Sequence, residues 1–216
     1  MTPVHIVGAG PGVGAAVARR FGRAGHPIGL IARNRSRLDA LARDLTADGI
    51  DTQVCAADAT DPAALAAALT ELARRQGPAG VLCFSPLPDV SLIKPVVDTT
   101  PADLGAALAL SVVGAAASVR AVLPAMRTTG RGSLLFVTGS AVVNPSADRA
   151  ASAVAGFAEK AYLDLLRDAL ATTPIQVAHL VVKGAVGVGA THEPDTVADR
   201  LWRLHAAPAE THALLE

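Results

Sequence analysis

Lys160 and Ser140 carry the polar groups of this sequence best suited to chemistry on an oxygen atom, because an ammonium and a hydroxyl both donate hydrogen bonds. Lys160 stands in the segment AVAGFAEKAYLDLLRDALA (153–171), which also contains Tyr162, the only tyrosine of the chain. Residues four apart share one face of a helix, whereas residues two apart do not. Gly156, which has no side chain, therefore shares the face of Lys160 one turn earlier, and Tyr162 is expected to pack elsewhere.

Two further side chains could supply a proton near these groups, and the sequence favours neither. Ser152 stands near the start of the same helix, but a serine hydroxyl is too weak an acid. His179 lies inside a predicted strand, where a buried or edge histidine with its hydrogen bonds satisfied is the commoner outcome.

Cys55 and Cys83 form no CxxC pair and have no histidine cluster nearby. We therefore expect no metal site and no redox motif.

A glycine-rich turn, GAGPGVG, follows the first predicted strand. Residues without a Cβ at such a turn let the backbone approach a pyrophosphate, which then lies at the N-terminus of the next helix. Val13 breaks the pattern GxGxxG, whereas Gly8, Gly12 and Gly14 satisfy the spacing GxxxGxG. The alternative is a tight turn of an α/β protein without a ligand. The position directly after the first strand favours a dinucleotide site.

The end of the second predicted strand indicates which nucleotide this site would take. An acidic residue usually holds the ribose hydroxyls there when the cofactor lacks a 2′-phosphate. Here Ala32 stands at that position and Arg33 follows it. Because a guanidinium can donate paired hydrogen bonds to a phosphate, the sequence favours NADP(H) over NAD(H). A solvated arginine before a helix is the alternative.

Short β-branched runs alternate with Ala- and Leu-rich helical patterns along the whole chain. This alternation predicts one doubly wound parallel sheet of the Rossmann type, with helices on both faces, in a single domain of residues 1–216. Ser36 and Asp61 are the expected N-caps of the second and third helices. Strands are predicted at residues 4–8, 28–33, 51–58, 80–85, 132–140 and 175–182, with a possible last strand from Thr211, and helices at 13–25, 36–49, 62–76, 101–127, 153–171 and 194–206.

Composition narrows the partners and the compartment. The 216 residues are 51% hydrophobic and 3% aromatic with a mean hydropathy of +0.39, and 19 basic residues balance 19 acidic ones. A net charge of zero gives no electrostatic reason to expect nucleic acid or an anionic membrane surface. The N-terminus has no signal-peptide pattern, and the uncharged stretches fall short of the ~20 apolar residues that span a bilayer. We expect a soluble, cytoplasmic protein, and the Ala-rich, Lys-poor composition is typical of GC-rich bacterial genomes.

Taken together, five motifs make the chain resemble the short-chain dehydrogenase/reductase superfamily over nearly its whole length. They are GxxxGxG after strand one, AR after strand two, AADATD after strand three, LPAM at 123–126, and a serine on strand five followed by a lysine-bearing helix. The resemblance implies an NADP(H)-dependent oxidoreductase with Ser140 and Lys160 as catalytic residues. It further implies a cofactor site formed by Gly8, Gly10, Pro11, Gly12, Val13, Arg33, Asp58, Ala59, Ser85, Lys160, Gly184 and Val186.

The departures from the family pattern concern the reacting end of the site. The family has a tyrosine four residues before its lysine, where this chain has Gly156, and Ser111 stands at the position of the family's asparagine. CFSP (83–86) replaces NNAG, and Lys183-Gly184 replaces a proline-glycine pair. The short stretch between Gly184 and Thr211 predicts a shortened substrate lid. In the family the tyrosine protonates the oxygen that hydride transfer leaves as an alkoxide, and this chain has no tyrosine before residue 162.

Three functions are consistent with these residues. The first is an NADP(H)-dependent oxidoreductase that reduces a C=O, C=N or activated C=C bond of a small molecule with a non-standard active site. The second is a non-redox enzyme on the same scaffold, catalysing a cyclisation or dehydration. The third is a non-catalytic, NADP-binding partner subunit. The resemblance also implies a homodimer or homotetramer formed through the helices at 101–127 and 153–171, because the family commonly associates through them.

Overall fold

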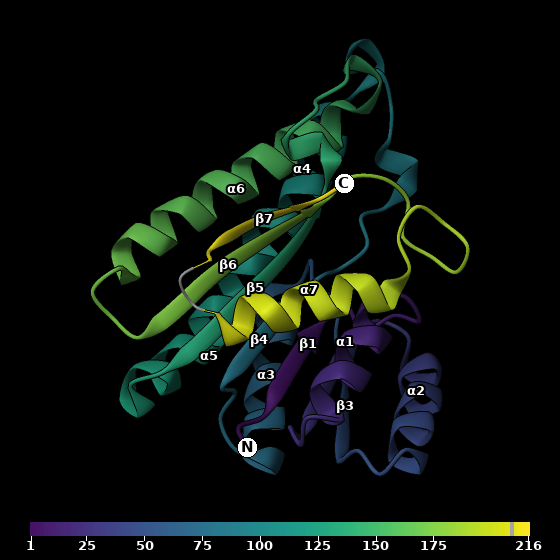
Figure 1. The fold of residues 1–216 in the computed structure, drawn as a ribbon. Helices are drawn as coiled ribbons and strands as arrows, with labels where there is room; N and C mark the ends of the chain where they lie inside the picture. The colour runs from purple at the N-terminus through teal and green to yellow at the C-terminus, as the bar shows by residue number, and fades with distance from the viewer. Residues whose placement is uncertain (208–209) are drawn as a thin grey trace.

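Seven short apolar runs form the strands of one sheet, and every neighbouring pair of strands is parallel. The computed structural model describes residues 1–207 and 210–216, and Figure 1 shows the strands lying between two layers of helices. The strand order is β3-β2-β1-β4-β5-β6-β7. This confirms the predicted doubly wound parallel sheet. The strands are β1 (Val4–Val7), β2 (Ile28–Ala32), β3 (Thr52–Ala56), β4 (Val81–Phe84), β5 (Gly132–Gly139), β6 (Ile175–Val182) and β7 (His212–Leu215).

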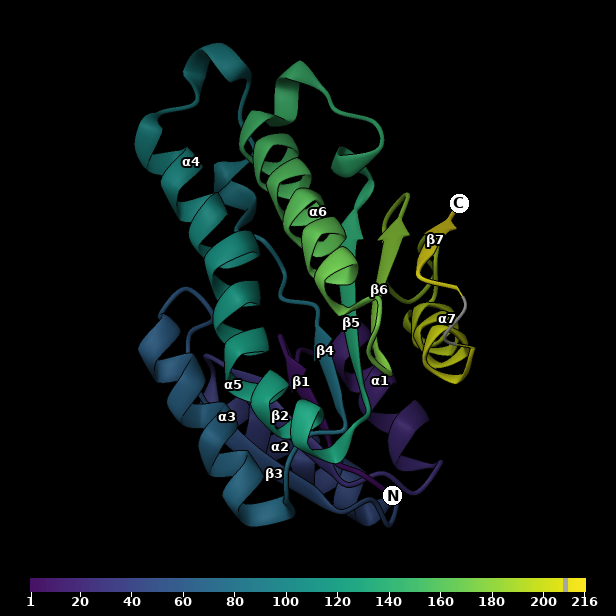
Figure 2. The same cartoon turned by 90° about the vertical axis from the view of Figure 1, so that its left-hand side faces the viewer.

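Six of the seven α-helices of the described chain cover the two faces of this sheet. Apolar side chains of α1, α2 and α7 pack on one face, and those of α3, α5 and α6 pack on the other. Figure 2 shows α3, α5 and α6 side by side in front of the strands. The helices are α1 (Val13–Gly22), α2 (Arg35–Ala47), α3 (Pro62–Gln76), α4 (Pro101–Leu108), α5 (Ala115–Thr129), α6 (Ala150–Leu170) and α7 (Pro194–Ala206).

Two of the helix starts can be compared with the predicted caps. Asp61 caps α3, since its carboxylate accepts hydrogen bonds from the N–H groups of Ala63 and Ala64, which confirms the prediction. The prediction of Ser36 as the cap of α2 is wrong. Asn34 takes that place, because its backbone is extended and its side-chain oxygen accepts from the N–H of Arg37 at 3.0 Å.

The long helix predicted at 101–127 is interrupted. Between α4 and α5 the residues Ala109–Gly114 form a π-helical turn, a feature that frequently marks functional sites. The whole stretch Pro101–Thr129 is long and apolar enough to cross a membrane by length and composition alone, and core helices of soluble proteins pass the same test. Here its second part packs Val119, Val122 and Met126 against the sheet, as a helix of a Rossmann layer does.

The order of the strands fixes where a ligand would bind. After β3 the chain crosses to the opposite side of β1 and forms β4, so β1 and β4 are neighbours at the point where the strand order reverses. Ligands of open parallel sheets bind in the crevice beyond the carboxyl ends of the strands at this point. The glycine-rich turn after β1 and the segment after β4 therefore meet at the expected site.

Candidate functional site

Two glycines of the glycine-rich turn lie so close to neighbouring backbone atoms that a side chain does not fit there. Gly8 has a φ of +90°, and a Cβ there would lie 2.5 Å from the Cα of Pro86 in the segment after β4. A Cβ at Gly14 would lie 2.7 Å from the Cα of Ala9. Both contacts are with backbone, which cannot move aside. The two glycines thus let the turn close tightly, as a dinucleotide site requires.

The other two glycines of the turn leave open space. A Cβ at Gly10 would come no closer than 4.0 Å to the carbonyl oxygen of Gly8, and a Cβ at Gly12 would meet nothing within 4 Å. Gly12 caps α1 without any side-chain hydrogen bond, and no acidic residue stands in the first turn of that helix. The exposed Pro11 and the half-buried Val13 complete the opening. Its open backbone and the positive end of the helix dipole fit a pyrophosphate.

Arg33 stands where the segments after β2, β3 and β4 converge. Asp58 accepts hydrogen bonds from the N–H and hydroxyl of Thr60 at 2.9 and 2.8 Å, and these bonds, together with the charge of Arg33, lower the pKa of Asp58. The same guanidinium contributes to the lowered pKa of Asp89, after the hydrogen bonds from Ser91. Within residues 1–207 and 210–216, Arg33 makes no ion pair. Its charge is available to an anion at this mouth of the site.

The buried backbone at the end of β3 lies close to the π-helical turn. Ala59 is 9% exposed, and its carbonyl oxygen would be 2.5 Å from a Cβ at Gly114. Ser85, at the end of β4, donates its N–H to the carbonyl of Val7 at 2.9 Å. Its buried hydroxyl has no hydrogen-bond partner in the described structure. Ser85 and Ala59 thus lie at the carboxyl edge of the sheet, where the sequence placed them.

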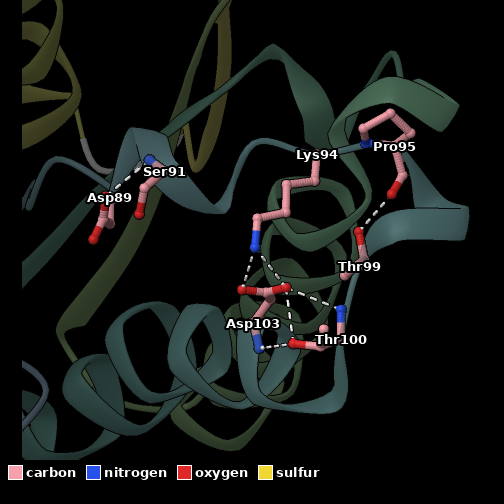
Figure 3. A network of polar contacts seen from close by, with 7 residues as sticks. All are labelled: Asp89, Ser91, Lys94, Pro95, Thr99, Thr100 and Asp103. Atoms are coloured by element: carbon pink, nitrogen blue, oxygen red, sulfur yellow. Dashed lines mark hydrogen bonds and ion pairs between the residues drawn. The ribbon is translucent and has the colours of Figure 1, made fainter.

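A polar network holds the segment after β4 against α4. Figure 3 shows Lys94 Nζ donating to both carboxylate oxygens of Asp103 at 3.0 Å, while the N–H and hydroxyl of Thr100 donate to Oδ2 at 2.9 Å. These hydrogen bonds, first those from Thr100 and then that from Lys94, lower the pKa of Asp103 to about 2. The carbonyl of Lys94 also accepts the N–H of Ala150 at the start of α6. The segment after β4, which forms one wall of the crevice, is thereby hydrogen-bonded to α4 and to the start of α6.

Ser140 begins the short turn that follows β5 (Ser140–Val142) and is half-buried. Its carbonyl accepts the N–H groups of Val143 and Asn144 at 3.0 and 2.8 Å. Gly156 of α6 lies opposite this turn, since a Cβ there would be 3.6 Å from the Cβ of Val142. The turn of α6 that faces Ser140–Val142 is therefore the one that contains Gly156.

Lys160 lies one helical turn further along α6, and its ammonium is already paired. Nζ contacts Asp164 Oδ2 at 2.5 Å, and Asp164 also accepts from Arg167 at 2.8 Å. Lys160, Asp164 and Arg167 all contribute to the electrostatic surroundings of the buried His179 on β6. The structure shows no hydrogen bond between Lys160 and Ser140 among the described residues. The assignment of Lys160 as the active-site lysine therefore stays a prediction, and its geometry favours a role in this ion-pair network.

Tyr162 and His179, the two other side chains near these groups in the sequence, both pack inside the fold. Tyr162 is half-buried in the core on the α6 side of the sheet, and burial raises its pKa, which confirms that it packs. His179 is fully buried on β6, where Nε2 lies 2.7 Å from the hydroxyl of Thr138, and burial lowers its pKa to about 4. Tyr162 is not part of the stripe of α6 that faces Ser140–Val142, and His179 lies on β6.

Glu159 is a polar group of this region that the sequence argument missed. It is 4% exposed, and burial raises its pKa to about 8, against a smaller opposite effect of a hydrogen bond from Ser111. A signal was present in the sequence. Ser152, Gly156, Glu159 and Leu163 follow the i, i+4, i+7, i+11 spacing of one helix face, so a glutamate interrupts the buried stripe.

The segment after β6 forms a small closed loop before α7. Gly184 has a φ of +114°, and a Cβ there would lie 2.9 Å from the side chain of Thr191. His192 Nε2 lies 2.9 Å from the carbonyl of Lys183, and Val186 pairs with His192 in an isolated bridge. Gly184 and Val186 thus lie just beyond the carboxyl end of β6, and their contact with the nicotinamide stays a prediction.

Comparison with known proteins agrees with this architecture. A family model described as short chain dehydrogenase matches residues 2–194. The chain is 30% identical to dehydrogenase/reductase SDR family member 7B of Bos taurus, covering 81% of this chain and 55% of that protein. It is also 30% identical to subunit BbsC of a hydroxy(phenyl)methylsuccinyl-CoA dehydrogenase of Thauera aromatica, covering 62% of this chain and 52% of that subunit. The chain thus spans about half the length of these curated relatives.

A solved structure extends the likeness to the entire chain. A metagenomic short-chain oxidoreductase in complex with NADP superposes with a TM-score of 0.88 at 27% identity, covering 100% of this chain and 96% of that one. The relation therefore includes every strand described above. It also includes both crevice walls, the one built on the glycine-rich turn and the one built on α6.

Proposed function

The chain belongs to the short-chain dehydrogenase family, a family of oxidoreductases, and from that premise we propose that it binds NADP(H) and reduces a C=O, C=N or activated C=C bond of a small molecule. The single observation that carries the proposal is the glycine-rich turn. Gly8 and Gly14 are required by backbone contacts, and Gly10 and Gly12 leave the space beside α1 open.

The preference for NADP(H) over NAD(H) rests on Arg33. Its guanidinium stands after β2 with no ion pair to another described residue, in the position where a 2′-phosphate would be held. The similar metagenomic oxidoreductase was solved with NADP. We propose that Arg33 binds the 2′-phosphate, that Gly12 and Val13 bind the pyrophosphate, and that Asp58 and Ala59 lie beside the adenine. The cofactor, when bound, supplies or accepts a hydride.

The remaining residues of the site orient the substrate and exclude water. We propose that the Ser140 hydroxyl donates a hydrogen bond to the reacting oxygen or nitrogen, and that Ser85, Gly184 and Val186 contact the nicotinamide end of the cofactor. The segment between β6 and α7 is short and closes on itself through the bridge between Val186 and His192, and we propose that it forms a shortened substrate lid.

Calorimetric titration with NADPH and NADH tests this function. We expect NADPH to bind more tightly than NADH, and Arg33→Ala to weaken NADPH by about 10- to 100-fold while leaving NADH unchanged, since a charge-assisted hydrogen bond contributes about 1.5–3 kcal/mol. Arg37→Ala is the matched control, because it removes a charge from the neighbouring first turn of α2. A panel of ketones, imines and enones then tests NADPH consumption in the wild type and in Ser140→Ala. Failure of both nucleotides to bind would contradict the proposal.

A second function, a nucleotide-binding partner subunit without catalysis, is favoured by two observations. The Thauera aromatica relative is named as a subunit of a dehydrogenase. The outer face of α6 also exposes Val154, Phe157 and Leu165, which are 46%, 45% and 70% accessible. We propose that α4, α5 and α6 form an interface between chains, with a copy of this chain as the first expectation. NADPH binding without consumption of NADPH by any substrate would favour this second function.

A further inference from the structure

Glu159 is a buried carboxyl whose hydrogen bonding does not account for its burial. It is 4% exposed, and its Oε1 has no hydrogen-bond partner among the described residues. Burying a carboxyl without full hydrogen bonding costs free energy. An alanine or leucine would fill this place in the stripe of α6 at no such cost. The burial of this carboxyl therefore indicates a functional role.

The surroundings of Glu159 place it at the back of the crevice. The hydrogen-bonding group that faces it is the hydroxyl of Ser111 in the π-helical turn. That turn ends at Gly114, which packs against the carbonyl of Ala59 and the ring of Phe84 at the carboxyl edge of the sheet. Figure 2 shows α6 lying beside the α4–α5 stretch, with α4 and the start of α6 reaching past the strands. Glu159 thus lies between the two helices that close the crevice from behind.

The direction of helical side chains brings the carboxyl toward the turn of α6 that contains Gly156. Side chains on a helix tilt toward its N-terminus and lie over the preceding turn. The preceding turn of the buried stripe of α6 holds Gly156, where a Cβ would touch only Val142, at 3.6 Å and beyond. The stripe continues toward the N-terminus with Ser152. No side chain from Gly156 therefore separates the Glu159 carboxyl from the turn that holds Ser140.

The charged groups around this carboxyl do not neutralise it. The π-helical turn Ala109–Gly114 and the turn Ser140–Val142 contain no ionisable residue. Asp103 of α4 is bound to Lys94 and Thr100. His179, which faces α6 from β6, is bonded to Thr138, and Lys160 is paired with Asp164. Burial is accordingly the main influence on the carboxyl and raises its pKa to about 8, so that at neutral pH it holds a proton.

We propose that Glu159 is the proton donor and acceptor of the active site, placed by Ser111 and reaching the reacting atoms past Gly156, which has no side chain. This inference rests on the proposed function. When a hydride from the reduced nicotinamide reaches the carbon of a C=O bond, the oxygen gains an electron pair. The O–H bond of the Glu159 carboxyl breaks, and an O–H bond forms on the substrate oxygen. The carboxylate regains its proton from water, and in the oxidative direction it removes the proton from the alcohol.

A binding experiment without substrate tests the position of Glu159. The nicotinamide ring carries a positive charge in NADP⁺ and none in NADPH, so a nearby carboxylate favours the oxidised form while a protonated carboxyl does not. We expect the affinity for NADP⁺ relative to NADPH, measured by calorimetry, to rise about tenfold between pH 6 and pH 9 in the wild type. Glu159→Gln should make this ratio independent of pH. Glu71→Gln, on the surface of α3, is the matched control and should follow the wild type.

A second variant separates a catalytic role from a structural one. Ser111→Ala removes the hydrogen bond that lowers the pKa of Glu159, so the midpoint of the change in the affinity ratio should move to higher pH while the carboxyl is retained. This variant also serves if Glu159→Gln does not fold. With an active substrate, the rate of reduction should fall above the same midpoint in the wild type and be low at every pH in Glu159→Gln.

The outcomes are distinct. A ratio that is constant with pH in the wild type, or that changes equally in Glu159→Gln, would overturn the assignment of Glu159 while leaving nucleotide binding intact. If neither nucleotide binds the wild type, the proposed function itself fails, and the role of Glu159 falls with it. A Ser111→Ala midpoint that does not move would show that the titrating group is not the one that Ser111 contacts.

Discussion

The two walls of the crevice are built in different ways. On the side of β1, the fit depends on backbone: Gly8 and Gly14 are packed against other main-chain atoms at 2.5–2.7 Å from where a Cβ would be. On the side of α6, the fit depends on side chains, and the position opposite Val142 is Gly156, where an added Cβ would be in ordinary contact with Val142 at 3.6 Å. The nucleotide wall contains the glycine pattern on which the family resemblance rests. We propose that the reacting wall carries other polar groups than the family pattern implies.

This difference teaches which part of a site can change without loss of the fold. A site made of backbone is part of the packing between β1 and β4, so a change there also disturbs the sheet. A site made of side chains on the surface of a helix can lose or gain a group at a cost of about 1 kcal/mol each. The glycine-rich turn therefore indicates the ligand more reliably than Lys160 indicates the chemistry.

The largest effect is expected from a change in the backbone-built wall. Gly8→Ala forces a positive φ on an L-residue and places a methyl group 2.5 Å from the backbone of Pro86. We expect a loss of about 4 kcal/mol in the free energy of unfolding, measured by urea denaturation. Gly10→Ala is the matched control: its methyl group meets nothing closer than 4.0 Å, so stability should change by less than about 1 kcal/mol. Equal losses in both variants would contradict the distinction between the two walls.

The next effect concerns the pH dependence of stability. Because burial raises the pKa of Glu159 in the folded state to about 8, above the 4.5 of an unperturbed glutamate, the folded state keeps a proton that the unfolded state has lost between these pH values. Stability due to this group is therefore greatest below about pH 4.5 and falls as the pH rises to about 8. The wild type should lose up to about 1 kcal/mol per pH unit relative to Glu159→Gln between pH 5 and pH 8. Parallel profiles of the two proteins in chemical denaturation would show that the carboxyl is solvated.

The smallest effect is expected at Lys160. Its ion pair with Asp164 is partly exposed, with side-chain accessibilities of 37% and 41%, and such pairs contribute about 0–1 kcal/mol. Lys160→Ala should leave NADPH affinity within about twofold of the wild type and lower stability only slightly. Calorimetry and thermal unfolding provide both values. A large loss of NADPH affinity would instead restore Lys160 to the cofactor site that the family resemblance gave it.

Sequence periodicity predicts the strands and most helices, because β-branched runs that alternate with Ala- and Leu-rich segments are typical of a parallel sheet covered by helices on both faces. Sequence periodicity does not identify a feature that depends on a single residue, such as the N-cap of a helix. Asn34 displaced Ser36 as the cap of α2, since both types can cap and only the backbone angles distinguish them. The role of Lys160 as the active-site lysine stays a prediction, because a shift of one turn along α6 changes which residues face Ser140.

Glu159 shows the second limit of sequence reasoning. A glutamate next to a lysine in an amphipathic segment is normally solvated, and only the position of Ser111 and the packing of α6 against the α4–α5 stretch bury it. The spacing from Ser152 and Gly156 was visible in the sequence. The position of its partner Ser111 was not visible there, because that position depends on the π-helical turn that interrupts the predicted long helix.

Hydrogen–deuterium exchange with and without saturating NADPH tests the central claim most directly, namely that the backbone-built wall binds the nucleotide. The N–H groups of residues 12–14 begin α1 and have no acceptor within their own helix. They should exchange fast in the free protein and markedly more slowly with NADPH bound, and the amides of Ala59 and Thr60 should slow as well. Nucleotide binding that leaves residues 12–14 unprotected, or that protects only α6, would contradict the account.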